Sequence, residues 1–229
     1  AAVFVREDDD VAATYTRVAT DYERFRALWL RLAGQGAEDE LFEDLAQVVG
    51  PESRVLDAGC GTGALARRVH AMQPVAALTM LDLTPAMLDR ARDVPGTHLV
   101  GDVQALPFPD DSFDVVMSGW VLETVPDPKR AAAEFLRVLA PGGFVLYCFC
   151  SLPDGWLSRG ASTWLREAVH RGFAGNFLDR EQMPVHECDR SRILRFQGGL
   201  TTLVVLRKCC SVTPDAVPIA MKDVPPTLL

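Results

Sequence analysis

Apolar side chains recur at helical spacing over the first part of the chain. From Val18 to Trp29 they follow one another at steps of three and four residues, which places them on one face of a helix. This pattern predicts a helix over residues 11–32. A second apolar face predicts a shorter helix over residues 38–49, which Gly50 ends.

Beyond residue 50 the pattern changes to short aliphatic runs that alternate with amphipathic stretches. Strands separated by helices predict parallel pairing with right-handed crossovers and helices on both faces of the sheet. The Pro141–Gly143 turn is expected to separate a helix from the fifth strand. Only Gly198 and Gly199 divide the last two runs, which predicts an antiparallel hairpin. The predicted strands are residues 54–58, 76–82, 98–100, 113–118, 144–150, 193–197 and 200–207, and the helices among them are residues 64–72, 85–92, 128–139 and 156–171.

The fold class that follows is α/β: a Rossmann-like, doubly wound sheet of seven strands, mostly parallel with a terminal antiparallel hairpin. Residues 1–50 are predicted to form an N-terminal helical cap, and residues 51–210 the sheet domain. Within that domain, residues 151–187 are predicted as a helical lid insertion. Residues 211–229 form a Pro-rich tail.

The chain is acidic, with 23 Lys and Arg against 31 Asp and Glu and a net charge of −8. Such a charge repels phosphate backbones, so we expect a small-molecule substrate and no nucleic acid. No run approaches the roughly 18 consecutive apolar residues of a membrane span. Residues 7–10 are acidic and no signal-peptide pattern is present, so a cytoplasmic location is expected. The six cysteines include no Cys-x-x-Cys pair and are expected to be reduced and mostly buried.

The strongest chemical signal is a glycine loop after the first predicted strand. Asp57 ends that strand, and Gly59, Gly61 and Gly63 follow at alternate positions before a helix. Glycines let the backbone turn tightly and let a ligand lie against it without interference from a Cβ atom. A glycine pattern by itself is also compatible with dinucleotide binding, so the neighbouring motifs decide between the two.

The sequence Val-Leu-Asp-Ala-Gly-Cys-Gly-Thr-Gly at residues 55–63 resembles the first motif of class I methyltransferases, which use S-adenosylmethionine. In that family an acidic residue ends strand one just before G-x-G-x-G. The resemblance implies that Asp57 organises the loop and, often through water, the methionine amine of the cofactor. It also implies that the backbone from Gly59 to Gly61 contacts the methionine part.

Further motifs follow in the order typical of that family, and the nearest group is the ubiquinone/menaquinone-type branch of small-molecule methyltransferases. Asp82 resembles the carboxylate that accepts the ribose hydroxyls, and Leu83 and Met87 would flank the adenine. Asp102 and Val103 resemble the adenine loop, in which the carboxylate accepts from the exocyclic amine. The cofactor-binding residues implied in this way are Tyr15, Tyr22, Asp57, Gly59, Cys60, Gly61, Gly63, Asp82, Leu83, Met87, Asp102, Val103 and Ser118.

The methyl acceptor is expected beyond the carboxyl ends of the strands, beside residues 118–125. Its candidate residues are Trp120, Glu123 and Trp156. Because a sulfonium methyl group is already activated, transfer needs alignment more than acid or base catalysis. Relatives carry a histidine in this segment and this chain has none there. Glu123 and His186 are therefore the candidate bases, although Glu123 could equally bind a cation or face solvent.

Several interpretations stay open. Tyr15 and Tyr22 share a helical face, where relatives cover the methionine carboxylate with an aromatic side chain; a packed aromatic stripe explains them equally well. The cysteines allow an arsenite-type metalloid methyltransferase, although Cys150 and Cys209 should lie about five residues, or roughly 16 Å, apart along adjacent strands. No resident metal site is expected. A non-catalytic S-adenosylmethionine-binding module is the other alternative. The acceptor and the oligomeric state are not determined by the sequence.

Overall fold

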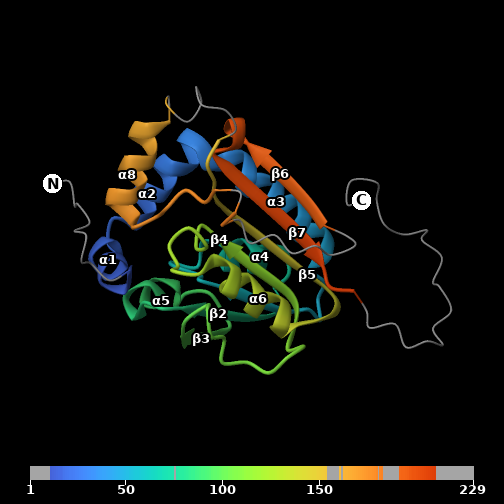
Figure 1. The fold of residues 1–229 in the computed structure, drawn as a ribbon. Coiled ribbons are helices and arrows are strands. Elements are labelled where there is room, and N and C mark those ends of the chain that lie inside the picture. Colours follow the sequence, from blue (N-terminus) through green and yellow to red (C-terminus); the bar gives the residue numbers. More distant parts are fainter. Residues whose placement is uncertain are drawn as a thin grey trace.

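The fold is a single twisted sheet with helices on both of its faces (Figure 1). The structure, a computed structural model, describes residues 11–74, 76–153, 160, 162–179, 181–182 and 191–209. The sheet has seven strands in the order β3-β2-β1-β4-β5-β7-β6. The strands are β1 (Arg54–Ala58), β2 (Ala77–Asp82), β3 (Thr97–Val100), β4 (Phe113–Gly119), β5 (Leu139–Cys150), β6 (Ser191–Phe196) and β7 (Thr201–Arg207).

Strand pairing agrees with the expected topology. β1 pairs in parallel with β2 and β4, and the parallel part extends to β3 on one side and to β5 on the other. β7 pairs antiparallel with both β5 and β6. The 3₁₀ turn η2 (Gln197–Gly199) joins β6 to β7. The predicted Rossmann-like sheet with a terminal antiparallel hairpin is confirmed.

The two faces of the sheet bury different side chains of the same strands, because successive residues of a strand point to opposite sides. In the described part of the chain, Val55 and Val115 pack with helices α3 (Gln35–Val48), α4 (Ala64–Met72) and α5 (Pro85–Ala91). Their neighbours Leu56 and Val116 pack on the other face with α6 (Pro128–Val138). Figure 1 shows α6 in front of the sheet and α3 and α4 behind it. Burial on both faces explains why the central strands are continuous apolar runs.

The N-terminal helices differ from the prediction. The expected helix over residues 11–32 is two helices, α1 (Val11–Val18) and α2 (Tyr22–Trp29), because Asp21 leaves the helical conformation with φ −103° and ψ 0°. The expected break before residue 38 does not occur. A π-helical segment, η1 (Leu30–Gly34), leads directly into α3.

Close packing against two tryptophans explains the glycine at this junction. A Cβ atom on Gly34 would lie 2.8 Å from Nε1 of Trp29 and 3.0 Å from the Trp120 ring. The glycine therefore marks a close approach of the helix to a buried ring, and it does not break the helix.

The start of β5 also differs from the prediction. The strand begins at Leu139, directly after α6, and contains the Pro-Gly-Gly sequence that was expected to precede it. The extra residues form a bulge: Phe113 pairs with Leu139, but Val115 pairs with Phe144. A Cβ atom on Gly143 would lie 2.6 Å from the carbonyl oxygen of Asp114, so only glycine fits against the neighbouring strand. The other predicted strand and helix ends shift by one or two residues, apart from the helix expected at residues 156–171. Residues 156–159 and 161 of that stretch lie outside the described residues, and α8 spans Thr163–Phe173.

Replacing Gly63 should test how far the fold depends on the glycine loop. Gly63 has φ +80°, and an added Cβ atom would lie 2.9 Å from Cβ of Ala91. We expect Gly63→Ala to lower the free energy of unfolding by about 1–3 kcal/mol, from left-handed strain and the forced shift of α5. Gly172→Ala in α8 is the matched control, since nothing lies within 4 Å of its Cβ position. The control should be neutral or stabilising by up to about 1 kcal/mol in urea denaturation. Equal changes in the free energy of unfolding of the two variants would contradict the conclusion that the fold depends on a glycine at position 63.

Candidate active site

The glycine loop between β1 and α4 has the backbone that its sequence requires. Gly59, Gly61 and Gly63 have φ values of +74°, +54° and +80°. A Cβ atom on Gly59 would lie 2.4 Å from Cγ2 of Val121, whereas one on Gly61 would meet nothing closer than Met87 Cε at 3.8 Å. The loop is therefore tightly packed at Gly59 and open at Gly61.

Asp57 lies fully buried beneath this loop. Its Oδ2 accepts a hydrogen bond of 3.1 Å from the backbone N–H of Ala66 in the first turn of α4, so the carboxylate also faces the positive end of that helix. Its Oδ1 is buried without a hydrogen-bond partner. Burial raises the pKa of Asp57 to about 7. A buried acceptor without a donor is costly and rare, so Oδ1 is a place for a bound donor group or a water molecule.

Asp82, at the end of β2, fixes the loop from the other side. Its Oδ2 accepts from the N–H of Gly61 and its Oδ1 from the N–H of Thr84, both at 2.8 Å. Burial raises the pKa of Asp82, and these two bonds oppose the rise. Each carboxylate oxygen keeps a second lone pair for a ligand.

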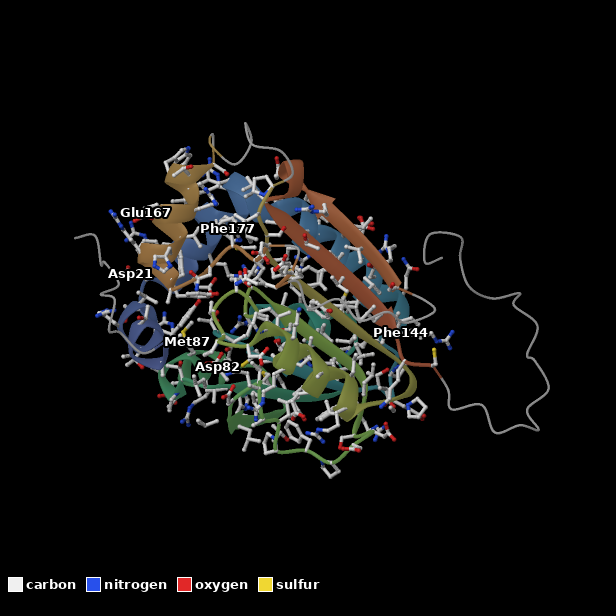
Figure 2. The ribbon with its side chains drawn as sticks, viewed as in Figure 1. Asp21, Asp82, Met87, Phe144, Glu167 and Phe177 are labelled. Atoms are coloured by element: carbon white, nitrogen blue, oxygen red, sulfur yellow. The ribbon has the colours of Figure 1, made fainter. Side chains whose placement is uncertain are left out.

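A cleft opens beyond the carboxyl ends of β1, β2 and β4. Asp82 and Met87, labelled in Figure 2, lie on its α5 side. Ten of the residues predicted for the cofactor or the acceptor line it: Tyr15, Tyr22, Gly59, Gly61, Asp82, Leu83, Met87, Asp102, Val103 and Trp120. Gly119, Val121, Thr124 and Val125, from the segment 118–125 that was expected to border the acceptor, also line it. The other lining residues, which were not named as candidates, are Val11, Thr84, Gly101, Gln104 and Pro126.

Four of the predicted cofactor residues do not line the cleft. Asp57 lies behind the loop, and Cys60 is buried in the core between the sheet and α4. Gly63 packs against α5. Ser118 is buried and donates from Oγ to the carbonyl oxygen of Ala58 at 2.7 Å, which joins β4 to β1. In this structure these residues support the cleft from behind.

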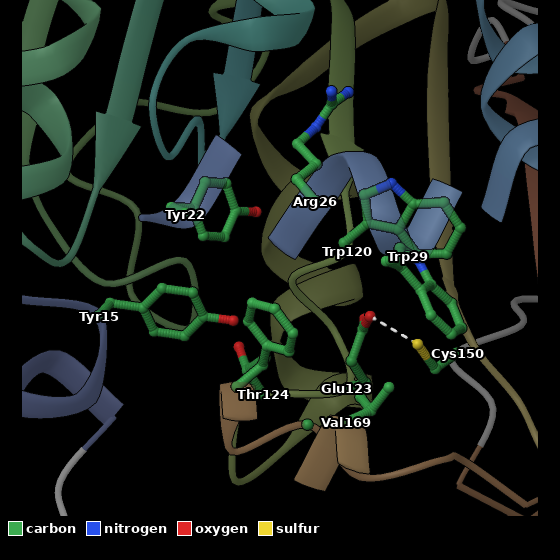
Figure 3. Close-up of a pocket in the computed structure, with 11 residues that line it drawn as sticks. Tyr15, Tyr22, Arg26, Trp29, Trp120, Glu123, Thr124, Cys150 and Val169 are labelled. Carbon is green, nitrogen blue, oxygen red and sulfur yellow. Dashed lines mark hydrogen bonds between the residues drawn. The ribbon is translucent and has the colours of Figure 1, made fainter. Parts of the chain in front are cut away.

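A smaller chamber of about 40 Å³ adjoins the cleft (Figure 3). Tyr15, Tyr22, Trp120 and Thr124 line both spaces, so they lie at the boundary between them. The other residues around the chamber are Arg26, Trp29, Glu123, Cys150, Val169, Phe173 and Gly175. A chamber of this volume holds a few water molecules or one small chemical group.

Glu123 is the ionisable group at the centre of this chamber. Its side chain is buried, with the residue 4% exposed, and its Oε1 accepts from Sγ of Cys150 at 3.1 Å. Its Oε2 has no hydrogen-bond partner. Figure 3 shows the carboxyl group pointing into the chamber. Burial raises the pKa of Glu123 to about 7, so the solvent-facing alternative does not apply.

Trp120 is held in place by a buried carboxylate that the sequence analysis did not identify. Trp120 has φ +62°, and its Nε1 donates to Glu38 at 3.1 Å. Arg26 donates from Nη2 to the other oxygen of Glu38 at 2.5 Å. The Trp29 ring meets the Trp120 ring edge-on, with centroids 5.5 Å apart. No spacing rule could have predicted this cluster, because Glu38 and Trp120 are 82 positions apart in the sequence.

The remaining candidates lie elsewhere. His186 and Trp156 fall outside the described residues. His170, on α8, is exposed and does not line the chamber. Within the described part of the chain, no group of three His, Cys, Asp or Glu side chains could hold a metal ion.

The cysteines do not form one cluster among the described residues. Cys148 and Cys150 are buried, and burial raises the pKa of both thiols. Cys209 is exposed and follows Arg207, which pairs with Phe144 at the opposite end of β5. It therefore lies further from Cys150 than the expected five residues, because β7 begins opposite Cys150 and runs the full length of the pairing.

The comparisons with known proteins agree with this geometry. Residues 56–147 match the family model described as a methyltransferase domain. The malonyl-[acyl-carrier protein] O-methyltransferase of Serratia marcescens is 35% identical over 160 residues, which are 67% of this chain and 57% of that protein. The ubiquinone/menaquinone biosynthesis C-methyltransferase of Dinoroseobacter shibae is 35% identical over 167 residues, 68% of this chain and 66% of that protein. The chain thus spans less than two thirds of the length of these curated relatives.

A solved structure shows the same fold. An S-adenosylmethionine-dependent methyltransferase from Thermotoga maritima superposes with a TM-score of 0.61 at 21% identity, covering 85% of this chain and 98% of that one. With the family match and the relatives, this shared fold makes the chain similar to the class I methyltransferases. It is similar to members of the small-molecule branch. No helix in the described residues has both the length and the apolar composition needed to cross a membrane.

The raised pKa of Glu123 predicts a pH-dependent effect of Glu123→Gln on stability. The pKa is about 7 in the folded chain, against roughly 4.3 when unfolded, so the folded state binds the proton more tightly between these values. This contribution to stability is complete below the unfolded pKa and is lost as the pH rises through 7. Relative to the wild type, Glu123→Gln should therefore gain about 2–3 kcal/mol between pH 5 and pH 8.

Urea denaturation of both proteins at the two pH values measures this difference, and the contributions of the other titrating groups cancel in the comparison. Glu43→Gln, an exposed position on α3, is the matched control and should show no such trend. A pH-independent difference between wild type and Glu123→Gln would show that Glu123 ionises normally.

Proposed function

We propose that this protein is an S-adenosylmethionine-dependent methyltransferase that acts on a small molecule. The observation that supports this most directly is the cleft at the carboxyl ends of β1, β2 and β4, which borders a small chamber with a buried acidic group. Open α/β sheets bind ligands at this edge. In this arrangement the cofactor occupies the cleft and the acceptor group occupies the chamber.

The residues of the cleft fit the cofactor. Gly61 leaves space beside the loop for a ligand, and Asp82 offers carboxylate lone pairs that suit ribose hydroxyls. Met87 and Val103 supply buried apolar surface suited to a purine ring. The unpartnered Oδ1 of Asp57 supplies an acceptor for an amine or for the water that bridges to it. When bound, S-adenosylmethionine supplies a methyl group activated by its sulfonium.

The residues around the chamber align the acceptor group, and one of them can take its proton. The ring of Trp120 and the two tyrosines at the boundary exclude water and limit the directions from which an acceptor can reach the cleft. Holding the acceptor close to the methyl group in this alignment lowers the activation barrier of the transfer. Glu123, with its pKa near 7, can accept a proton from the acceptor group at neutral pH.

The acceptors of the relatives are not assigned to this chain. One relative is named for O-methylation of a malonyl group on an acyl carrier protein and the other for C-methylation in quinone biosynthesis. The two names imply different acceptor atoms, so similarity alone does not select one. A cytoplasmic location is part of the same proposal, since the described cysteines are all free thiols, as in reducing compartments.

Calorimetric titration with S-adenosylmethionine tests the cofactor site. Asp82→Asn keeps the shape of the side chain but removes its charge and one acceptor oxygen. The dissociation constant should rise by about 10- to 150-fold, which corresponds to the 1.5–3 kcal/mol of hydrogen bonds to a charged group. Asp89→Asn, an exposed position on α5 that pairs with Arg92, is the control and should bind like the wild type.

Two results would decide against the proposal. If the wild-type protein is folded but does not bind S-adenosylmethionine, this molecule is excluded as its cofactor. If a folded Asp82→Asn variant has an unchanged dissociation constant, Asp82 does not bind the ribose hydroxyls of the cofactor. Circular dichroism of each variant checks the fold, because Asp82 also holds the backbone of Gly61 and Thr84.

A further inference from the structure

We infer that the methyl acceptor is an amine that binds as an ammonium cation, recognised by the Glu123 carboxylate inside an aromatic chamber. This inference rests on the proposed function and specifies the substrate class of the same site. Its basis is the combination of a buried, unpartnered carboxylate oxygen with five aromatic rings among the eleven residues that line the chamber.

The charges around the chamber leave Glu123 without a counter-ion. Arg26, from α2, is the one basic residue of the described lining, and its guanidinium is 2.5 Å from Glu38, whose side chain is only 4% exposed. Arg68 also lies 4.0 Å from Glu38. Glu38 therefore compensates Arg26, and nothing in the described structure compensates Glu123. An unpaired buried carboxylate is costly, so a bound cation would stabilise its ionised form.

The other titratable groups that face Glu123 stay neutral near pH 7. Burial raises the pKa of Tyr15 on α1, of Tyr22 on α2 and of Cys150 on β5. Among the described lining residues, Glu123 is thus the group whose charge changes near neutral pH. An ammonium group would meet the Glu123 carboxylate, neutral side chains and an Arg26 guanidinium that is already paired with Glu38.

The walls of the chamber suit the same ligand. The Trp29 and Trp120 rings lie edge to face, and the Tyr22 ring packs edge-on against Phe173 with centroids 6.2 Å apart. Tyr15 completes this group 6.1 Å from Tyr22. Aromatic faces attract cations, and tryptophan does so most strongly. A carboxylic acid acceptor would gain nothing from the ring faces and would require Glu123 to be protonated.

The chemistry of the transfer balances with Glu123 as the base. The ammonium group R–NH₃⁺ gives one proton to the Glu123 carboxylate and becomes a neutral amine. The nitrogen lone pair then forms a bond to the methyl carbon, while the carbon–sulfur bond breaks and its electron pair stays on sulfur. The products are R–NH₂–CH₃⁺ and S-adenosylhomocysteine, and the proton on Glu123 passes to solvent. A carboxyl group with a pKa near 7 is suited to this exchange.

The experiment compares two probes of the same shape and opposite charge. Phenethylamine and 3-phenylpropionate are titrated calorimetrically into protein saturated with S-adenosylhomocysteine, at pH 6 and pH 8. We expect phenethylamine to bind the wild type, and more tightly at pH 8, because Glu123 is then ionised while the amine keeps its proton. Glu123→Gln should weaken this binding at least tenfold, and Glu43→Gln should leave it unchanged. Mass spectrometry should show N-methylated phenethylamine from the wild type with S-adenosylmethionine.

The outcomes separate this inference from the proposed function. If the protein prefers 3-phenylpropionate, binds it more tightly at pH 6 and still binds it in Glu123→Gln, the acceptor is not an amine. That result would indicate an anionic acceptor. Equal phenethylamine affinities in the wild type and in a folded Glu123→Gln variant would also overturn it, and so would no binding of phenethylamine. In each case intact binding of S-adenosylhomocysteine leaves the methyltransferase assignment standing, whereas loss of that binding in the wild type removes the assignment itself.

Discussion

The parallel pairing of β1 with both β2 and β4 determines where everything else in the site lies. Asp57 pairs with Met80 on one side and with Met117 on the other, so the three strands end at the same edge. The loops after them must then meet, and the hydrogen bond from Gly61 to Asp82 joins two of them directly. The cleft is a consequence of this shared edge, as in other open α/β sheets.

At that edge the protein buries carboxyl groups that lack full hydrogen bonding. Asp57 and Glu123 each keep one oxygen without a partner in the described structure, and burial raises the pKa of both to about 7. Such groups destabilise an empty fold and gain their partners when a ligand binds. Perturbed carboxyl groups beside a cleft are typical of functional sites. Here Glu123 lines the chamber, and Asp57 lies behind the glycine loop of the cleft.

The N-terminal helices α2 and α3 position the wall between the two spaces. Glu38 on α3 holds Arg26 and the Trp120 indole together, and the continuous helix from α2 through η1 into α3 fixes their distance. This wall is a tertiary construction, because its members come from two segments far apart in the sequence. It explains why a helix that contains two glycines, at positions 34 and 36, continues without a break: Gly34 lies against the tryptophan rings, and a larger residue would displace them.

The sequence by itself determined the strands, the terminal hairpin and the glycine loop, because these depend on local patterns: short apolar runs, the glycines after Asp57, and the two glycines between the last strands. It did not determine the split of the first helix at Asp21, the bulge at the start of β5, or the positions of Asp57 and Ser118 behind the loop. Only the tertiary structure placed Glu123 in a small chamber beside aromatic rings and paired Arg26 with Glu38. Burial and charge compensation depend on residues distant in sequence, and no local pattern encodes them.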